Sequence, residues 1–275
     1  MSTQKELEKS EFPERIYGWR KEDPKVIEEI ESLLLYRRGY ISREPIDEEV
    51  VFIVSGGLDS SVAMDLVIRE WNIRKIHPLF VRRSARATPY EEKAADFFIN
   101  FYKQRYPGRM GDLRVVETEI PPLVFKTYAE PNRLQTLGHP MRNSALQTLG
   151  VQYANMLRAK DSPDLHTVLT ATVGDDSFPH SSLAALRSVN LATCIDTGDW
   201  KWLVTSPLVD TQYKGRPLFK SDLIRYAVEN SIPLERTRSC IEGGGFACGM
   251  CPECIGRLKS FNEVGISDPA EYSSN

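Results

Sequence analysis

The sequence lacks several features that mark other classes of protein. No apolar run approaches the roughly 20 residues that a membrane-spanning helix needs, and the charged start of the chain does not resemble a signal peptide. Basic residues do not outnumber acidic ones: 35 Lys and Arg against 38 Asp and Glu give a net charge of −3. That balance argues against a large nucleic-acid footprint. We therefore expect a cytoplasmic protein with neither a membrane nor a nucleic-acid partner.

Cysteine is scarce and unevenly placed. The chain of 275 residues has five cysteines, four of them within Cys240–Cys254. An odd count with one tight cluster suits a reducing compartment and a metal site better than a disulfide framework. The fifth, Cys194, lies in an apolar helical stretch and is expected to be a buried core residue. A chain of this length can bury one large α/β core with a small appendage.

The most informative stretch is Val50–Met64. Five apolar residues predict a strand buried on both faces, and the turn Ser55-Gly56-Gly57 separates it from a segment with helical spacing. The two glycines let backbone N–H groups approach an anion, and the following helix points its positive end at the same place. No Gly-Lys-Ser/Thr follows, so this is not a Walker A loop. The pattern predicts a phosphate-binding loop, with an ordinary serine-glycine turn as the alternative.

Ser-Gly-Gly-Leu-Asp-Ser matches the SGGxDS loop of the PP-loop ATP pyrophosphatases. This resemblance implies an enzyme that grips the pyrophosphate of ATP, transfers AMP to a substrate oxygen and releases pyrophosphate. It implies ATP as cosubstrate and Mg²⁺ as cofactor, because the Asp59 carboxylate can hold the ion through oxygen. The expected cofactor-binding residues are Ser55, Gly56, Gly57, Leu58, Asp59, Ser60, Ser61, Phe80 and Val81.

Strands and helices alternate after the loop. Strands are expected at 75–81, 113–120, 166–173 and 202–206, and helices at 89–106, 140–159, 181–194 and 219–231. This order predicts an α/β fold with a mostly parallel, doubly wound sheet and a ligand site at the carboxyl ends of its strands. Residues 49–235 are expected to form the ATP-binding domain, 1–48 an N-terminal helical extension and 236–275 a zinc-binding C-terminal segment.

The extension contains one clear helical pattern, Pro24–Leu35. Val26, Ile27, Ile30 and Leu34 are predicted to share one face. We expect this helix to pack on the sheet edge. The alternative is an arm that binds a partner protein or a second copy of the chain.

The four clustered cysteines have the spacing C-x7-C-x2-C-x2-C. Tight thiolate spacings with intervening glycines suit tetrahedral Zn²⁺, and four protein ligands leave no open position, so the predicted site is structural. An iron–sulfur cluster is the alternative. The predicted metal ligands are Cys240, Cys248, Cys251 and Cys254.

A PP-loop near the start and a four-cysteine knot near the end together resemble the QueC family, the 7-cyano-7-deazaguanine synthases, from about Val50 to about Phe261. Further landmarks of the resemblance are His139–Asn143, Gly174–His180, Ser206–Leu208 with Lys220, and Arg238–Cys240. The resemblance implies adenylation of a 7-deazaguanine carboxylate with pyrophosphate release, followed by amide or nitrile formation with ammonia, as in queuosine biosynthesis.

The resemblance also suggests roles for individual residues. Arg142 and Lys220 are candidates to steady phosphate oxygens or the acyl carboxylate, with an ordinary ion-paired cation as the alternative. Asp175, Asp176 and His180 could hydrogen-bond a purine edge, or simply cap the following helix. The candidate catalytic residues are Asp59, Ser60, Arg142 and Lys220. The candidate substrate-binding residues are Asn143, Asp175, Asp176, Phe178 and His180.

Several departures from the family pattern leave the product open. Nearly fifty residues precede the first strand, the first cysteine gap is one residue short, and Arg82–Arg86 replaces a Tyr-Gly-Gln-x-His segment. Phe178 and His180 replace the tyrosine and acid of a Tyr-Pro-Asp motif. The arginines could attract an anionic substrate or form a solvated loop. One alternative function is a QueC-like ligase of antiviral defence operons that joins the deazaguanine to a protein amine. Another is a non-catalytic nucleotide-binding scaffold.

Overall fold

A computed structural model describes residues 24–42, 49–71, 73–126, 138–210 and 216–273. Five parallel strands form one sheet in the order β3-β2-β1-β4-β5, which confirms the predicted parallel α/β fold. The chain builds outward from β1 to β2 and β3, then returns to the other side for β4 and β5. The strands are β1 (Glu49–Val54), β2 (Lys75–Arg82), β3 (Arg114–Glu117), β4 (Thr167–Leu169) and β5 (Leu203–Thr205).

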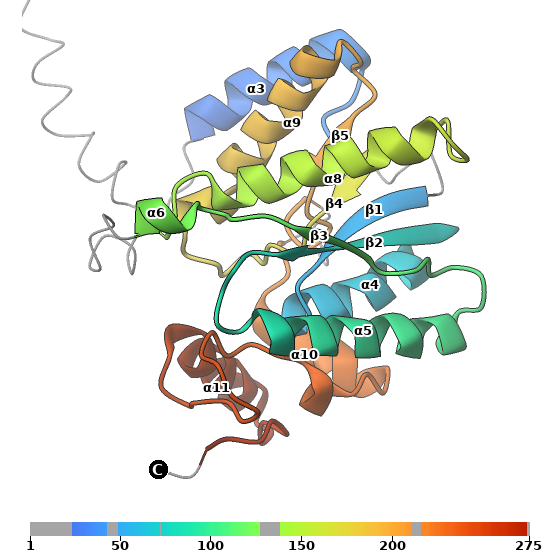
Figure 1. Cartoon of the computed structure of the whole chain (residues 1–275). Coiled ribbons are helices and arrows are strands. Elements are labelled where there is room, and N and C mark those ends of the chain that lie inside the picture. The colour runs from blue at the N-terminus through green and yellow to red at the C-terminus, as the bar shows by residue number, and fades with distance from the viewer. Residues whose placement is uncertain (1–23, 43–48, 72, 127–137, 211–215, 274–275) are drawn as a thin grey trace, which may run out of the picture.

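Helices cover both faces of the sheet (Figure 1), with α8 and α9 on one face and α4, α5 and α10 on the other. In the described part of the chain, no helix has the length and apolar character to cross a membrane. The α-helices are α3 (Pro24–Arg38), α4 (Leu58–Glu70), α5 (Thr88–Arg105), α6 (Leu123–Lys126), α8 (Arg142–Arg158), α9 (Leu183–Thr197), α10 (Lys220–Glu229) and α11 (Pro252–Val264). The described residues also form two 3₁₀ turns, η1 (Pro179–Ser181) and η2 (Leu234–Arg236).

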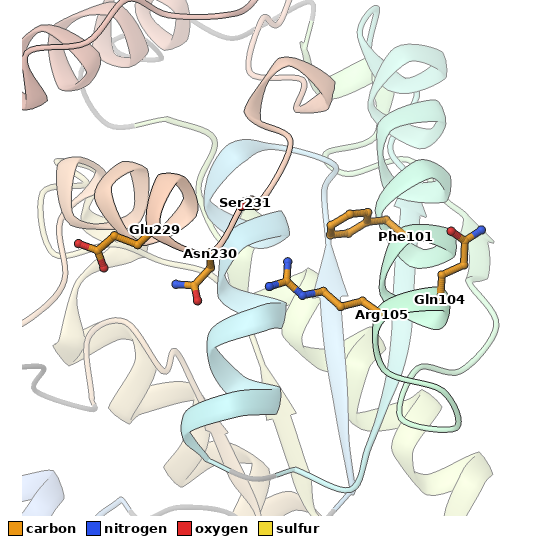
Figure 2. Close-up of a pocket in the computed structure, with 6 residues that line it drawn as sticks. All are labelled: Phe101, Gln104, Arg105, Glu229, Asn230 and Ser231. Atoms are coloured by element: carbon orange, nitrogen blue, oxygen red, sulfur yellow. The ribbon is translucent and has the colours of Figure 1, made fainter.

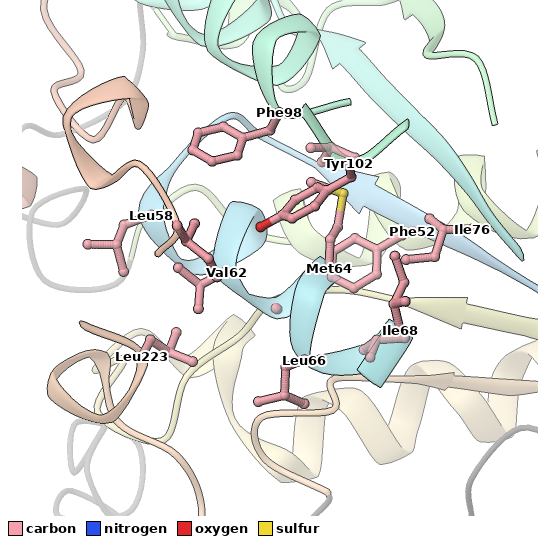
Figure 3. Close-up of a cluster of buried hydrophobic side chains, with 14 of the residues drawn as sticks. Phe52, Leu58, Val62, Met64, Leu66, Ile68, Ile76, Phe98, Tyr102 and Leu223 are labelled. Carbon is pink, nitrogen blue, oxygen red and sulfur yellow. The ribbon is translucent and has the colours of Figure 1, made fainter. Parts of the chain in front are cut away.

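The central strand β1 divides the core by side-chain alternation. Val50, Phe52 and Val54 face a cluster built largely with α4 and α5, whereas Val51 faces a second cluster with α8 and α9. Figure 3 shows Phe52 packed among side chains of α4 and α5 such as Met64. Burying one such side chain stabilises the fold by about 1.5–3 kcal/mol. This core fixes the end of β1, and with it the loop that follows.

Cys194 is fully buried in the second cluster, as expected for a core residue.

The structure corrects three details of the predicted elements. The strands expected at 113–120 and 166–173 are too long, because the chain leaves the sheet after Glu117 and Leu169. The helix α11 was not predicted, since its first turn lies within the cysteine motif. The predicted apolar face of α3 is only partly covered: Leu34 is fully buried, but Val26 is 42% exposed.

Helix α3 packs against α9, which lies over β5 at the edge of the sheet (Figure 1). Its main packing partner is therefore the helix α9, whereas the expectation was packing on the sheet edge itself.

Candidate active site

The phosphate loop begins where β1 ends at Val54 and turns into α4 at Leu58. Gly56 has φ +71°, and a Cβ there would lie 2.2 Å from the carbonyl oxygen of Glu91. Glycine is therefore required both by the backbone conformation and by the close approach of α5. This contact seats the loop at the carboxyl end of β1, at the point where the strand order reverses.

Hydrogen-bond donors converge in this loop. The backbone N–H of Gly57 donates to Ser55 Oγ (3.2 Å), and that of Ser55 donates to Ser60 Oγ (3.2 Å). The two hydroxyl oxygens lie 3.0 Å apart. Because these groups gather at the N-terminus of α4, where the helix dipole is positive, the loop is suited to hold an anion such as pyrophosphate.

Replacing Gly56 tests whether the close approach matters. We expect Gly56→Ala to lower the free energy of unfolding by roughly 3 kcal/mol or more, since it combines a positive φ with a backbone clash. Gly108→Ala is the matched control, because Gly108 has φ +80° but no atom within 4 Å of the place that a Cβ would occupy. The control should cost about 1–2 kcal/mol. Equal losses in urea unfolding of the two variants would contradict the steric argument.

Besides Ser60, which is itself 3% exposed, four of the predicted cofactor-binding residues have buried side chains. Leu58, Ser61, Phe80 and Val81 are 1%, 0%, 1% and 5% exposed. Leu58 and Phe80 pack in one core cluster and Val81 in the other. Any contact of these residues with a nucleotide must therefore come mainly through their backbone.

Asp59 and Lys220 form an ion pair beside the loop, with Lys220 Nζ 3.4 Å from Asp59 Oδ2. Burial raises the pKa of Asp59, and the positive charge of Lys220 opposes that rise. The negative charge of Asp59 in turn raises the pKa of Lys220. Among the described residues, Asp59 Oδ1 is buried and has no hydrogen-bond partner. A buried, unpartnered carboxylate oxygen beside a phosphate loop fits a Mg²⁺ ligand.

Asp175 and Asp176 organise the turn that follows β4. Asp175 Oδ1 accepts the backbone N–H of Lys220 (3.1 Å), which fixes the start of α10 against this turn. Asp176 Oδ1 accepts the backbone N–H of Phe178 (3.1 Å). Ser182, not either aspartate, caps α9 by accepting the N–H of Ala185 (3.1 Å). The helix-cap alternative for the two aspartates is therefore wrong.

The remaining predicted substrate residues meet at the start of α8. Arg142 Nη2 lies 3.1 Å from His180 Nε2, and Asn143 Nδ2 donates to the carbonyl of His180 (3.3 Å). The rings of Phe178 and His180 stack with centroids 5.3 Å apart. Since a guanidinium can only donate, His180 Nε2 is the acceptor. Burial, and secondarily the nearby charge of Arg83, lowers the pKa of Arg142, so this corner is electrostatically suited to an anion.

The arginines after β2 are ion-paired. Arg82 donates two hydrogen bonds to Glu92 (2.7 and 2.6 Å), and Arg83 Nη2 lies 3.2 Å from both carboxylate oxygens of Glu91. Arg86 pairs with a glutamate of the cysteine segment at 3.4 Å. These arginines therefore do not form a simple solvated basic loop, because the paired glutamates neutralise much of their positive charge.

Two residues near the site were missed by sequence reasoning. The backbone N–H of Arg238 donates to the carbonyl of Gly56 (2.8 Å), and its guanidinium lies over the Tyr90 ring, 5.0 Å from the centroid. Burial dominates the raised pKa of Asp59 and the lowered pKa of Arg142, and the charge of Asp59 dominates the raised pKa of Lys220. The negative charge of Glu253, in the first turn of α11, adds a smaller upward contribution to the pKa of each of these three groups. Its charge therefore acts on both the phosphate side and the acyl side of the site. Its position between two metal cysteines concealed this role.

The four predicted metal ligands come together. The Sγ atoms of Cys240, Cys248, Cys251 and Cys254 all lie within 4.8 Å of one another. Tetrahedral Zn²⁺ with Zn–S bonds of about 2.3 Å requires sulfurs about 3.8 Å apart, so the donor set fits zinc. Backbone N–H groups of Met250 and Cys251 lower the pKa of Cys248 to about 7, which favours the thiolate that a metal needs.

A surface hollow of about 520 Å³ lies elsewhere, near the C-terminal ends of α5 and α10 (Figure 2). It contains none of the predicted site residues. Arg105 at its wall is directed to the buried Asp65, with Nε 3.6 Å from Oδ1. Asp65 also accepts the hydroxyls of Tyr106 (2.7 Å) and Tyr226 (3.0 Å). This cluster joins α4, α5 and the end of α10 and has an evident structural role.

Known proteins are similar to most of this chain. Residues 49–265 match the family model "Queuosine biosynthesis protein QueC". The 7-cyano-7-deazaguanine synthase of Acetivibrio thermocellus is 26% identical over 233 residues, covering 81% of this chain and 96% of that protein. The Thermoplasma acidophilum protein of the same name is 28% identical, covering 82% and 92%. A solved structure, U34-tRNA thiolase NcsA from Methanococcus maripaludis with its [4Fe-4S] cluster, is 14% identical over 88% of this chain and 73% of that chain. Its TM-score of 0.35 is too low for comparing sites.

The family match identifies an ATP-dependent enzyme that forms carbon–nitrogen bonds. A parallel α/β sheet with an anion-binding loop at its switch point, and an ion pair beside that loop, suits such an enzyme. The chain belongs to the QueC family.

Proposed function

We propose that this enzyme adenylates the carboxylate of a 7-deazaguanine acid, releases pyrophosphate and passes the acyl group to an amine. The observation that carries the proposal is the hydrogen bond from Lys220 to Asp175, which connects the segments that carry two half-sites. The phosphate loop with Asp59 and Lys220 forms one, and the corner formed by Arg142 and His180 forms the other. The turn at Asp175 links them, because it holds the first residue of α10.

The chemistry requires both half-sites. A carboxylate is a poor electrophile until its oxygen is converted into a leaving group. Attack of the carboxylate oxygen on the α-phosphorus of ATP forms a mixed anhydride and expels pyrophosphate. Loop N–H groups, the Ser55 and Ser60 hydroxyls and Lys220 would stabilise the charge on the departing pyrophosphate. An amine then attacks the acyl carbon, AMP leaves, and the amine loses its proton.

The implied metals fit residues already described. Mg²⁺ bound by Asp59 would neutralise charge on the phosphates. Zn²⁺ bound by the four cysteines would be structural, since four protein thiolates leave no position for a substrate.

An isotope experiment tests the adenylation. The enzyme is incubated with 7-carboxy-7-deazaguanine carrying ¹⁸O in its carboxylate, with ATP, Mg²⁺ and ammonia. We expect pyrophosphate and AMP containing one ¹⁸O atom, since the attacking oxygen stays with AMP when the amine displaces it. Release of ADP and phosphate, or AMP without ¹⁸O, would contradict the proposal.

The same incubation also shows whether the product is an amide or a nitrile. A nitrile requires a second adenylation, this time of the amide oxygen. We expect amide or adenylate to accumulate and nitrile to form slowly. The segment after β2, which follows the strand beside the phosphate loop, is held by the pairs of Arg82 with Glu92 and Arg83 with Glu91. That arrangement restricts the repositioning that a second activation needs. Mass analysis of the products is the measurement, and efficient turnover to nitrile would show the prediction wrong.

The acceptor is ammonia or a protein amine. If ammonia gives only adenylate and free AMP, a peptide amine is the next acceptor to supply, and a covalent mass increase on it would support the ligase alternative. The non-catalytic alternative predicts no pyrophosphate release under any of these conditions.

A further inference from the structure

The N-terminal helix is joined to the body of the protein by a buried ionic junction. Arg187 of α9, only 5% exposed, donates from Nε to Glu31 of α3 (2.8 Å). Its Nη1 lies 2.5 Å from Oδ1 of Asp210, whose side chain is 1% exposed. Ser42, after α3, donates to the other carboxylate oxygen of Asp210 (3.2 Å). The N-terminal segment therefore reaches the buried carboxylate of Asp210 in two ways. Glu31 reaches it through Arg187, and Ser42 contacts it directly.

A second contact fixes the end of α3. Arg38 donates from Nη1 to the carbonyl of Trp202 beside β5 (2.6 Å) and from Nε to the carbonyl of Tyr40 (2.9 Å). The guanidinium of Arg37 lies over the Trp200 ring, 4.5 Å from its centroid. These contacts hold residues 37–42 against the edge of the sheet. They thereby place Ser42 within hydrogen-bonding distance of Asp210.

Asp210 belongs to the segment that carries Lys220. Near Asp210, the carbonyl of Leu208 accepts the N–H of Leu218 (2.8 Å). This hydrogen bond connects the residues next to Asp210 directly with those next to Lys220. The carbonyl of Leu218 accepts the N–H of Gly174 (2.8 Å), and Lys220 follows two residues later with its N–H on Asp175. Arg187 also lies one turn into α9, the helix that begins directly after the turn carrying His180.

We propose that residues 24–42 are a built-in brace of the active site, in which Arg187 is a positioning residue that holds Asp210 and thereby the placement of Lys220. An unpaired Asp210 would be expelled from its buried position or protonated, since an isolated buried charge is strongly disfavoured. Either event releases the segment at Leu208 and Leu218 and moves the start of α10.

Hydrogen exchange tests the brace without requiring any reaction. In Arg187→Met, we expect amides in residues 216–224 to exchange at least tenfold faster, with those of β1 and α4 unchanged. Glu31→Ala, a change on the partly exposed α3 that leaves the arginine–aspartate pair in place, should accelerate the same amides at least threefold. It keeps the test available if the first variant does not fold. Parental exchange in residues 216–224 in both variants would overturn the proposal.

Pyrophosphate release provides the second test, which rests on the proposed function. We expect Arg187→Met to lower kcat/KM for ATP at least tenfold, and Arg187→Lys to restore much of the loss. If Arg187 acts through Lys220, adding Arg187→Met to Lys220→Met should change the residual rate less than twofold. A further tenfold loss in that background would overturn the positioning role.

Arg158→Met is the control, because Arg158 pairs with Asp199 (3.4 Å) at the far end of α8. The rate of this variant should stay within twofold of the parental rate.

The two proposals fail separately. A parental enzyme that releases no pyrophosphate from ATP with the deazaguanine acid would contradict the proposed function, while the exchange measurements would still decide whether the brace exists.

Discussion

Replacing Asp59 by asparagine is expected to reduce pyrophosphate release by at least about 10³-fold, the scale on which preorganised electrostatic groups act in active sites. Asparagine keeps the volume of the side chain but removes the charge that pairs with Lys220 at 3.4 Å. It also exchanges the charged carboxylate, whose buried Oδ1 fits a Mg²⁺ ligand, for a neutral amide that binds the ion more weakly. The loss should appear mainly in kcat, because the charge on the departing pyrophosphate is greatest in the transition state.

The fold should survive this change because two effects on stability oppose each other. Burial raises the pKa of Asp59, so its ionised form is a cost to the folded state that asparagine removes. Lys220 has a raised pKa because of Asp59, so the lysine loses favourable pairing. We expect the melting temperature to change by only a few degrees.

The measurement is coupled detection of pyrophosphate, with Glu70→Gln on the exposed last turn of the same helix as control. A control rate within twofold of the parent and a thousandfold loss in Asp59→Asn would place the ion pair at the chemistry. A parental rate in Asp59→Asn would mean that this pair is not part of the active site.

Local sequence was sufficient for the phosphate loop and the metal cluster. The apolar run of β1, the turn at Gly56 and the four cysteine spacings are contiguous patterns whose geometry depends on neighbours in the chain. The structure accordingly places the loop at the end of β1 and gathers the four sulfurs. The exact length of β4 was not predictable in this way. Thr170, Thr172 and Val173 are good strand residues. However, β4 ends at Leu169, Thr170 makes one more backbone hydrogen bond to Thr205 (2.9 Å), and the chain then forms the turn at Asp175.

Contacts between distant segments were beyond sequence reasoning. Arg82 and Arg83 were expected either to attract an anionic substrate or to lie in a solvated loop, yet α5 supplies glutamates that pair with both. Arg187 gave no signal at all, because its partner Glu31 is 156 residues away and neither residue belongs to a motif. Such pairs become visible only after the sheet order has brought α3, α9 and the segment after β5 together.

Removing one metal ligand is the other change with a large expected effect. Cys251→Ala should lower the zinc content from about one ion per chain to nearly none, because three thiolates hold Zn²⁺ far less tightly than four. Metal binding supplies about 10–16 kcal/mol in isolated zinc-finger peptides. Even partial coupling to this larger fold should lower the melting temperature by roughly 10 °C.

Loss of the metal should also weaken nucleotide binding, because the cysteine segment is connected to the phosphate loop through Arg238. Arg238 lies two residues before Cys240, and its backbone N–H donates to the carbonyl of Gly56 (2.8 Å). A cysteine segment without its metal would release this contact, so we expect the affinity for ATP to fall at least tenfold in Cys251→Ala.

Cys194→Ser is the control, since it changes the cysteine that lies in the core outside the cluster. That control should retain the metal and the nucleotide affinity even if its stability falls. Metal analysis of both variants, followed by ATP titration at a temperature where both remain folded, is the measurement. A Cys251→Ala protein that lacks metal but binds ATP like the parent would show that the cysteine segment does not support the loop.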